Sequence, residues 1–165
     1  MTSYILGIDP GNKGAVALLS LDGSELDWFK IPTRIEVEGT QKRRIDGKEL
    51  YEHLSNFDIL TCYIEKQAYK NPKLIANYGI CMGVLDALDI PFMSMPPASW
   101  MKSLKSRIGF DEIKNGPEKE FTFKAFEYVY PHIDLPKKGN GLDDDIADAA
   151  LLAYLCYLNI EREKY

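Results

Sequence analysis

Four carboxylates occur where apolar segments of the chain begin or end, and they are Asp9, Glu65, Asp145 and Asp148. Residues 4–8 are an apolar run typical of a buried strand, and a Pro10-Gly11 turn follows Asp9. Residues 60–64 form a second apolar run, which ends at Glu65. A buried carboxylate costs free energy unless a cation or hydrogen bonds compensate it. The structural alternatives are a turn-initiating role for Asp9 and a salt bridge from Glu65 to a nearby lysine.

The acids near the last apolar segment also have two interpretations. Asp145 and Asp148 are three residues apart, so they would share one face of a helix. The triplet of Asp143, Asp144 and Asp145 could instead cap that helix and offset its dipole. Capping does not explain Asp148, which lies among alanines that would let the helix approach a sheet closely.

Four converging carboxylates would repel one another strongly if no lysine or arginine lay between them. Divalent cations offset such repulsion, and Mg²⁺ prefers oxygen ligands and phosphate-bearing substrates. Two Mg²⁺ ions about 4 Å apart can activate a water and stabilise the leaving oxygen in a displacement at phosphorus. His53 and His132 are isolated, and we interpret both as surface or packing residues. The acids therefore predict a magnesium site rather than a zinc site, with Mn²⁺ as a substitute.

The composition favours one domain over residues 1–165, with 45% hydrophobic residues for its core. The three cysteines are widely spaced and no apolar run has the length of a membrane span, so we expect a soluble cytoplasmic protein with reduced thiols. The net charge of −5 argues against a nucleic-acid partner. If six of the acids faced metal ions, however, the remaining charges would nearly balance, so charge does not decide the partner.

The hydrophobic pattern predicts an α/β fold. Strands are expected at 4–9, 14–20, 25–31, 60–65 and 90–95, and helices at 46–55, 72–88, 97–104, 118–130 and 142–162. Asp22-Gly23 is a hairpin signal, so the first three strands should form an antiparallel meander within a mixed sheet. Segments 32–45, 105–117 and 137–141 are expected to be loops.

Gly79 and Gly83 lie one turn apart in the predicted helix 72–88. Glycines inside a helix cost about 1 kcal/mol each relative to alanine, so they usually indicate close approach of another backbone. That backbone is either the sheet of the same chain or the same helix of a second copy.

Taken together, these stretches resemble the RuvC family of Holliday-junction resolvases, in the RNase H-like (retroviral integrase) superfamily. The matching stretches are Ile5–Gly11, Tyr63–Glu65 and Asp145–Ala153, in the family's order and at about its spacing. The resemblance implies an RNase H-like fold with a five-stranded mixed sheet, three strands antiparallel and then two parallel. It also implies a homodimeric, Mg²⁺-dependent endonuclease that resolves Holliday junctions or other branched DNA by paired nicks. The short, divergent form looks more like phage or viral members, which act in the bacterial host cytoplasm.

The resemblance further implies roles for individual residues. Asp9, Glu65, Asp145 and Asp148 would bind two Mg²⁺ ions, with Asp144 as a reserve candidate. Lys102 and Lys119 look like the family's two basic residues, which would hold phosphates near the scissile bond. The glycine pair on helix 72–88 matches one on the family's dimer helix. The residues expected to contact DNA are Lys13, Arg43, Arg44, Tyr69, Lys70, Lys105 and Arg107.

One residue departs from the family's pattern. The family usually has an aromatic residue three positions after the glutamate, where Ala68 stands here and Tyr69 follows. Tyr69 is therefore either a base-stacking residue or a packing residue.

Three other functions stay open at this point. Gly7–Gly11 followed by Gly14 also resembles the phosphate-binding turn of actin-like proteins and sugar kinases. Those proteins clamp a nucleotide between two such domains, whereas 165 residues supply one. A DNA-binding module without catalysis would not need the four acids. An RNase H-like nuclease acting on RNA–DNA hybrids would share the same fold and metals.

Overall fold

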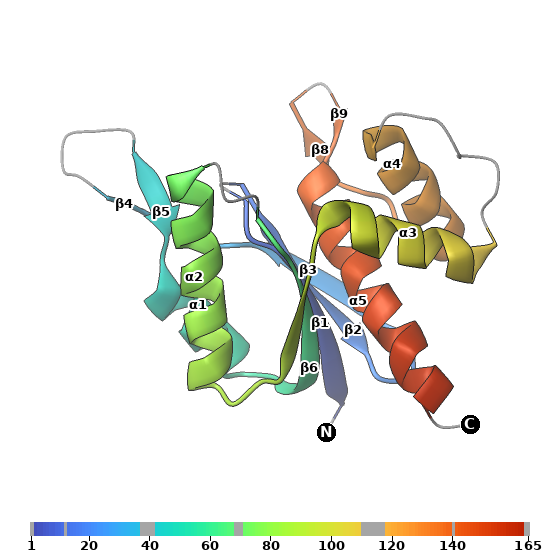
Figure 1. Ribbon diagram of the computed structural model, residues 1–165, viewed down its shortest axis with the longest axis horizontal. Helices are drawn as coiled ribbons and strands as arrows, with labels where there is room; N and C mark the ends of the chain where they lie inside the picture. The colour runs from blue at the N-terminus through green and yellow to red at the C-terminus, as the bar shows by residue number, and fades with distance from the viewer. Residues whose placement is uncertain are drawn as a thin grey trace.

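The computed structural model describes residues 2–11, 13–36, 42–67, 71–109, 118–139 and 141–163, apart from the side chains of residues 118, 119 and 163. A five-stranded sheet lies at its centre, with the strand order β3-β2-β1-β6-β7 (Figure 1). The strands are β1 (Ser3–Asp9), β2 (Ala15–Ser20), β3 (Leu26–Lys30), β6 (Asp58–Glu65) and β7 (Phe92–Met95).

The directions of these strands confirm the predicted mixed sheet. Strand β2 pairs antiparallel with both β1 and β3, whereas β6 pairs parallel with both β1 and β7. The Asp22-Gly23 turn joins β2 to β3, and Gly23 adopts a φ of 74° that glycine tolerates. Ile8 of β1 pairs in register with Ile64 of β6, so these two central strands end side by side.

Helices cover both faces of the sheet (Figure 1). The helices α1 (Gly47–Leu54) and α2 (Pro72–Ala87) lie on one face, and α3 (Pro97–Ile108), α4 (Glu118–Val129) and α5 (Asp144–Glu163) lie on the other. Strand β1 is buried between the two layers. Leu6 and Ile8 pack into the core beneath α1 and α2, whereas Ile5 packs into the core beneath the other helices.

Small residues bring α5 directly onto β1. A Cβ atom added to Gly7 would lie 1.9 Å from the carbonyl oxygen of Ala149 and 2.5 Å from the amide nitrogen of Ala153. Ala147 and Ala150 are also fully buried. This confirms that the alanines let α5 approach the sheet, which places the beginning of α5 near the end of β1.

Two segments that we predicted as loops form small hairpins instead. Segment 32–45 contains β4 (Thr33–Ile35) paired with β5 (Arg43–Ile45), and segment 137–141 contains β8 (Lys137–Lys138) paired with β9 (Gly141–Leu142). Ladders of two or three residues are too short to show a sequence period.

Side-chain contacts hold the β4–β5 hairpin. Arg43 donates hydrogen bonds to the Thr33 hydroxyl (2.8 Å) and carbonyl (2.7 Å) oxygens. The Ile45 amide donates to Asn77 Oδ1 on α2 (3.3 Å), and Ile45 itself is buried. The hairpin is thus attached to α2 by contacts between residues that are distant in sequence.

The predicted loop 105–117 is also wrong in its first part. Helix α3 continues to Ile108 and ends at Gly109, whose φ of 66° is a common helix-terminating conformation. Lys105 and Arg107 are therefore helical residues, and positions 110–117 lie outside the described residues.

Gly79 and Gly83 do not serve the packing of α2 on its own sheet. Within the described part of the chain, a Cβ atom added at either position meets no atom within 4 Å. The first of the two explanations for this pair, approach of the sheet, is therefore wrong.

Two further expectations concern the chain as a whole. No helix in the described ranges is both long and apolar enough to cross a membrane. Cys62, Cys81 and Cys156 are free and buried, which confirms the prediction of unpaired thiols.

Candidate active site

Two of the predicted carboxylates meet at the same edge of the sheet. Asp9 ends β1 and is 8% exposed, and the Gly11 amide donates a hydrogen bond to its Oδ1 (3.0 Å). Glu65 ends the neighbouring parallel strand β6, and Trp100 Nε1 donates to its Oε2 (2.9 Å). Parallel strands end at a common edge, so the sheet itself places both acids there.

Helices α4 and α5 add a third carboxylate. Asp148 lies in the second turn of α5, and the hydroxyl of Thr122 on α4 donates a 2.9 Å hydrogen bond to its Oδ1. Thr122 is 2% exposed. Each of the three acids thus accepts at least one hydrogen bond from a neutral donor, which orients the carboxylate without neutralising its charge.

Burial and the charges of neighbouring acids raise the pKa values of Asp9 and Asp148. Burial raises the pKa of Asp9 to about 7, with further contributions from Glu65 and Asp145. Burial likewise raises the pKa of Asp148 to about 8, with contributions from Glu65 and Asp9. The hydrogen bonds from Gly11 and Thr122 oppose these shifts. The predicted acids therefore form one electrostatic group that a cation would stabilise.

Asp145 differs from the other three because two lysines neutralise it. Lys30 Nζ lies 3.0 Å from both Asp143 Oδ1 and Asp145 Oδ2. Lys138 Nζ lies 2.8 Å from Asp144 Oδ1 and 2.5 Å from Asp145 Oδ2. Burial alone would lower the pKa of Lys138, but these hydrogen bonds raise it above its ordinary value. The expectation that no lysine lies between the converging acids is therefore wrong for Asp145.

The acidic triplet at the start of α5 is partly a helix cap. Asp143 is 6% exposed, and its Oδ1 accepts a 3.2 Å hydrogen bond from the Ile146 amide. One oxygen each of Asp143, Asp144 and Asp145 lies within 4.8 Å of the others. The capping interpretation holds for Asp143, while Asp144 and Asp145 face Lys138.

The donor atoms of this edge fit a hard divalent cation. All of the candidate ligands are carboxylates. In the described ranges, the group whose possible ligand atoms all lie within 4.8 Å of one another is Asp143, Asp144 and Asp145, and it includes neither a histidine or cysteine nor Asp9, Glu65 or Asp148. Oxygen ligands suit Mg²⁺ or Mn²⁺, whereas zinc sites use nitrogen and sulfur more often. Burial, with the charges of the neighbouring acids, raises the pKa of Asp9 and of Asp148, and for Asp9 the charge of Lys30 offsets part of this rise.

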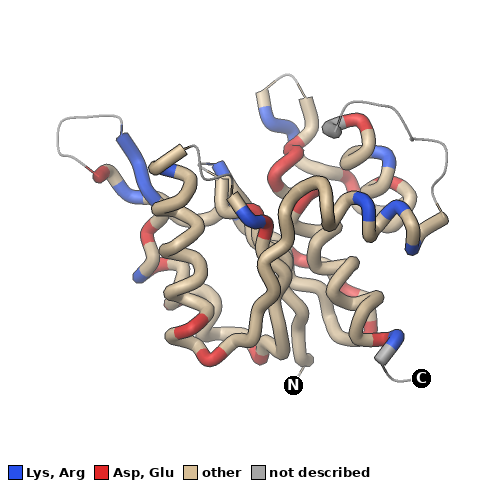
Figure 2. The backbone as a smooth tube through the Cα atoms, viewed as in Figure 1, with Lys and Arg blue, Asp and Glu red and all other residues tan. Residues whose placement is uncertain are grey.

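The edge of the sheet where β1 and β6 end at Asp9 and Glu65 is called the acidic edge below. The β4–β5 and β8–β9 hairpins carry basic residues and stand on either side of this edge (Figure 2). Lys13, in the turn between β1 and β2, and Arg43 of β5 line one cavity together with Lys30 and Lys138. Arg44 lines a second cavity, which the β4–β5 hairpin forms with α2. The structure thus brings Lys13 and Arg43 close to the acids, with Arg44 on the other side of the hairpin.

The predicted basic residues of α3 comprise one exposed side chain and two that contact neighbouring helices. Lys102 is exposed, and Lys105 Nζ lies 4.5 Å from the centre of the Phe121 ring. Arg107 Nη2 donates to Asn159 Oδ1 (2.5 Å), almost four turns along α5 from Asp145. Three further predicted residues, Tyr69, Lys70 and the side chain of Lys119, lie outside the described residues.

Sequence reasoning missed several residues that contact the acids. Trp100 and Thr122 orient two of the carboxylates, and Lys30 and Lys138 pair with a third. The Lys137-Lys138 pair is visible as a basic cluster, and Lys30 is the next-to-last residue of the predicted strand 25–31. No sequence signal identifies Thr122, since its role depends on how α4 crosses α5.

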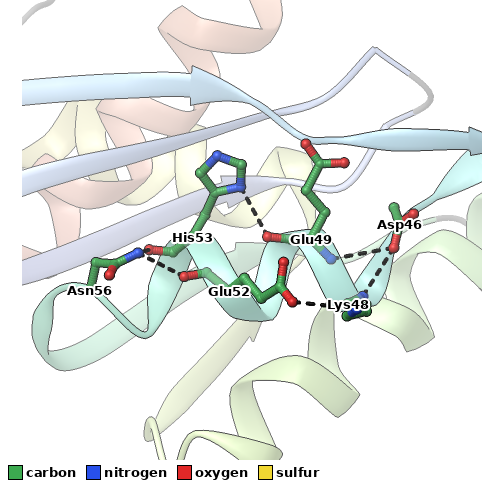
Figure 3. Close-up of a pocket in the computed structure, with 6 residues that line it drawn as sticks. All are labelled: Asp46, Lys48, Glu49, Glu52, His53 and Asn56. Atoms are coloured by element: carbon green, nitrogen blue, oxygen red, sulfur yellow. Dashed lines mark hydrogen bonds and ion pairs between the residues drawn. The ribbon is translucent and has the colours of Figure 1, made fainter.

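A separate polar pocket lies on α1, and Figure 3 shows the six residues that line it: Asp46, Lys48, Glu49, Glu52, His53 and Asn56. Asp46 caps the helix by accepting from the amides of Lys48 (3.1 Å) and Glu49 (3.3 Å). His53 Nδ1 contacts the Glu49 carbonyl oxygen (2.9 Å), and its ring stacks on Phe29 at 5.3 Å. These groups satisfy one another along the helix, and the exposed His53 is a surface or packing residue, as predicted.

Comparisons with known proteins support the fold. No protein-family model and no curated protein matches the sequence. A structure of Thermus thermophilus RuvC is similar, with 14% identity, a TM-score of 0.56 and coverage of 96% of both chains. The structure of T. thermophilus RuvC in complex with a Holliday junction substrate gives 16% identity, a TM-score of 0.55 and the same coverage. The fold is therefore RNase H-like and of the RuvC type, while the roles of individual residues rest on the geometry described above.

Proposed function

We propose that this protein is a divalent-metal-dependent endonuclease that cuts branched DNA, with the four-way Holliday junction as its main substrate. The observation that carries the proposal is that Asp9, Glu65 and Asp148, from three separate elements, lie near enough for the charge of Glu65 to raise the pKa of both Asp9 and Asp148. Strongly perturbed carboxylates grouped in this way are typical of functional sites. The RuvC-like fold supports the same class of reaction, since one similar structure is RuvC with a Holliday junction substrate.

Two Mg²⁺ ions would be held by Asp9, Glu65, Asp145 and Asp148, with Asp144 as a further candidate ligand. Bound Mg²⁺ supplies Lewis-acid activation of water and stabilises the leaving oxygen in phosphodiester hydrolysis. Mn²⁺ accepts the same oxygen donors and can substitute. Asp145 already pairs with Lys30 and Lys138, so metal binding there competes with two ion pairs.

The other residues of the chain orient the acids and hold the DNA. Trp100 and Thr122 keep Glu65 and Asp148 in place through their hydrogen bonds. Lys102 and Lys119 would hold phosphates beside the scissile bond. Further contacts to the DNA backbone or bases are proposed for Lys13, Arg43, Arg44, Tyr69, Lys70 and Lys105. Arg107 is left out of this set because it is bonded to Asn159 of α5.

The active form would be a homodimer that meets through α2. Gly79 and Gly83 are exposed and leave room for close approach of a second helix. Two-fold symmetry would present two active sites to opposed strands of a four-way junction, which accounts for paired nicks.

Cleavage of a labelled four-way junction tests this proposal. Purified protein with Mg²⁺ should introduce paired nicks that leave 5′-phosphate and 3′-hydroxyl ends. The variant Asp9→Asn should lose cleavage but still bind the junction in EDTA, because it removes a metal ligand and leaves the basic surface unchanged. Asp134→Asn, an exposed acid in the connection between α4 and β8, is the matched control and should cut normally.

Two results would contradict the proposal. One is a wild-type protein that binds the junction with Mg²⁺ present and leaves it intact, and the other is full cleavage by Asp9→Asn. Parallel assays on a flap, a plain duplex and an RNA–DNA hybrid define the substrate. Preferential cleavage of the hybrid would replace the junction with an RNase H-type substrate.

A further inference from the structure

The basic cavity beside the acidic edge has an unusual concentration of positive charge for a chain of net charge −5. Its volume is about 420 Å³, and it is lined by the side chains of Lys13, Lys30, Arg43, Lys73, Lys138 and Asp143, among others. These residues come from the β1–β2 turn, β3, β5, α2, β8 and the residue before α5. Five cations therefore face one carboxylate.

Ion pairs divide the five cations into two groups. Lys30 and Lys138 are paired with the carboxylates at the start of α5. Lys13 and Lys73 have no ion pair within the part of the chain that the structure describes, and both are exposed. Their charges repel one another and Arg43, so an anion in the cavity would lower the free energy.

Arg43 is already oriented within this cavity. Its Nε and one terminal nitrogen donate to Thr33, a neutral partner, at 2.8 and 2.7 Å. A guanidinium group has five N–H donors, so three remain for a ligand. Planar, fixed donors of this kind suit phosphate oxygens.

We propose that this cavity is a subsite that binds one backbone phosphate of the cut DNA strand. That phosphate neighbours the scissile phosphate, and Lys13, Arg43 and Lys73 contact it. The inference rests on the proposed nuclease function, because a strand cut at the acidic edge must continue past one of the two flanking hairpins. Lys30 and Lys138 form the wall between this subsite and the acids, since they contact both. Of these five cations, the sequence analysis named only Lys13 and Arg43 as contacts to nucleic acid.

Equilibrium binding of a fluorescent four-way junction in EDTA, measured over a range of salt concentrations, tests the subsite apart from cleavage. Each lost phosphate contact should reduce the slope of log K against log salt by roughly 1. The double variant Lys13→Ala/Lys73→Ala should therefore show a slope shallower by about 2 units than the wild type. Arg162→Ala, at the far end of α5, removes one positive charge and should leave the slope unchanged.

The outcomes separate the subsite from the nuclease proposal. A double variant that keeps the wild-type slope and affinity, in a protein that cuts junctions, would overturn the subsite alone. A shallower slope in a protein that does not cut would support the subsite and contradict the nuclease. A third outcome is that dAMP binds to the wild type and not to the double variant, while both proteins bind the junction equally. The cavity would then be a mononucleotide site, and the proposal would be wrong. Both lysines are exposed, and circular dichroism checks that the variants are folded.

Discussion

At the scale of single residues, Asp9 and Asp148 are carboxylates whose ionised forms the fold compensates only in part. The pKa of Asp9 rises from 3.8 to about 7 on folding, so the folded state binds its proton more tightly than the unfolded state. The stabilising contribution is therefore present below about pH 4 and is lost as the pH rises through 7. At pH 8 without metal, ionised Asp9 costs up to about 4 kcal/mol relative to a neutral group, on 1.36 kcal/mol per pKa unit.

Replacing Asp9 with asparagine should therefore stabilise the metal-free protein at pH 8, because a neutral amide of similar size removes the buried charge. Denaturant unfolding in EDTA should give a higher free energy of unfolding for Asp9→Asn at pH 8 than for the wild type. The difference should disappear at pH 4, where Asp9 is protonated. Adding Mg²⁺ at pH 8 should stabilise the wild type and not the variant.

The exposed replacement Asp134→Asn serves as the control and should change stability little at either pH. A wild type that is more stable than Asp9→Asn in EDTA at pH 8 would show that cations within the chain already compensate the carboxylate.

At the scale of elements, the crossing of α5 over β1 determines the geometry of the site. Asp9 is two residues after Gly7, and Asp148 is adjacent to Ala149, so the same contact that packs the helix also places the acids. Gly7→Ala would put a methyl group inside the van der Waals radius of the Ala149 carbonyl oxygen. Overpacking of this kind costs roughly 3 kcal/mol.

We expect Gly7→Ala to unfold at a melting temperature lower by about 6–12 °C, on 2–4 °C per kcal/mol. The variant should also bind Mg²⁺ more weakly in a calorimetric titration carried out below its melting temperature, since α5 must move away from β1. An unchanged melting temperature would mean that the helix can shift without cost.

The glycines of α2 should respond in the opposite direction. Alanine at Gly79 and Gly83 meets open space in the described chain, so each replacement should stabilise the monomer by roughly 1 kcal/mol through helix propensity. The same methyl groups should weaken the proposed dimer, because they occupy the surface where the partner helix would approach. Sedimentation velocity and denaturant unfolding of Gly79→Ala/Gly83→Ala check the two effects separately. A double variant that is more stable and equally dimeric would exclude α2 as the interface.

At the scale of the whole molecule, the positions of the charged side chains say more about a binding partner than the net charge does. The net charge of −5 gave no clear indication of a nucleic-acid partner. In the folded chain, Lys30 and Lys138 pair with acids, while Lys13 and Lys73 face a cavity beside them. Only the fold distinguishes these two kinds of lysine.

The sequence predicted the sheet, its mixed direction and the positions of its strand ends because long apolar runs and the Asp22-Gly23 turn are local signals. It also identified Asp9 and Glu65, since an acid that ends a buried strand is visible in the sequence. The short hairpins and the contacts of Trp100 and Thr122 were not predictable, because they depend on residues that are far apart along the chain. The roles of all these residues in catalysis stay predictions until the variants above are measured.

The contact between Gly7 and Ala149 also has a consequence for the order of events during folding. The two residues are about 140 positions apart, so one of the longest loops in the chain must close before they meet. The chain entropy lost in closing such a loop must be paid before the contact stabilises the fold. Asp9 and Asp148 are brought together by that same closure, so a partly folded chain would lack the acidic edge. The ability to hold a divalent cation would then require that this loop has closed.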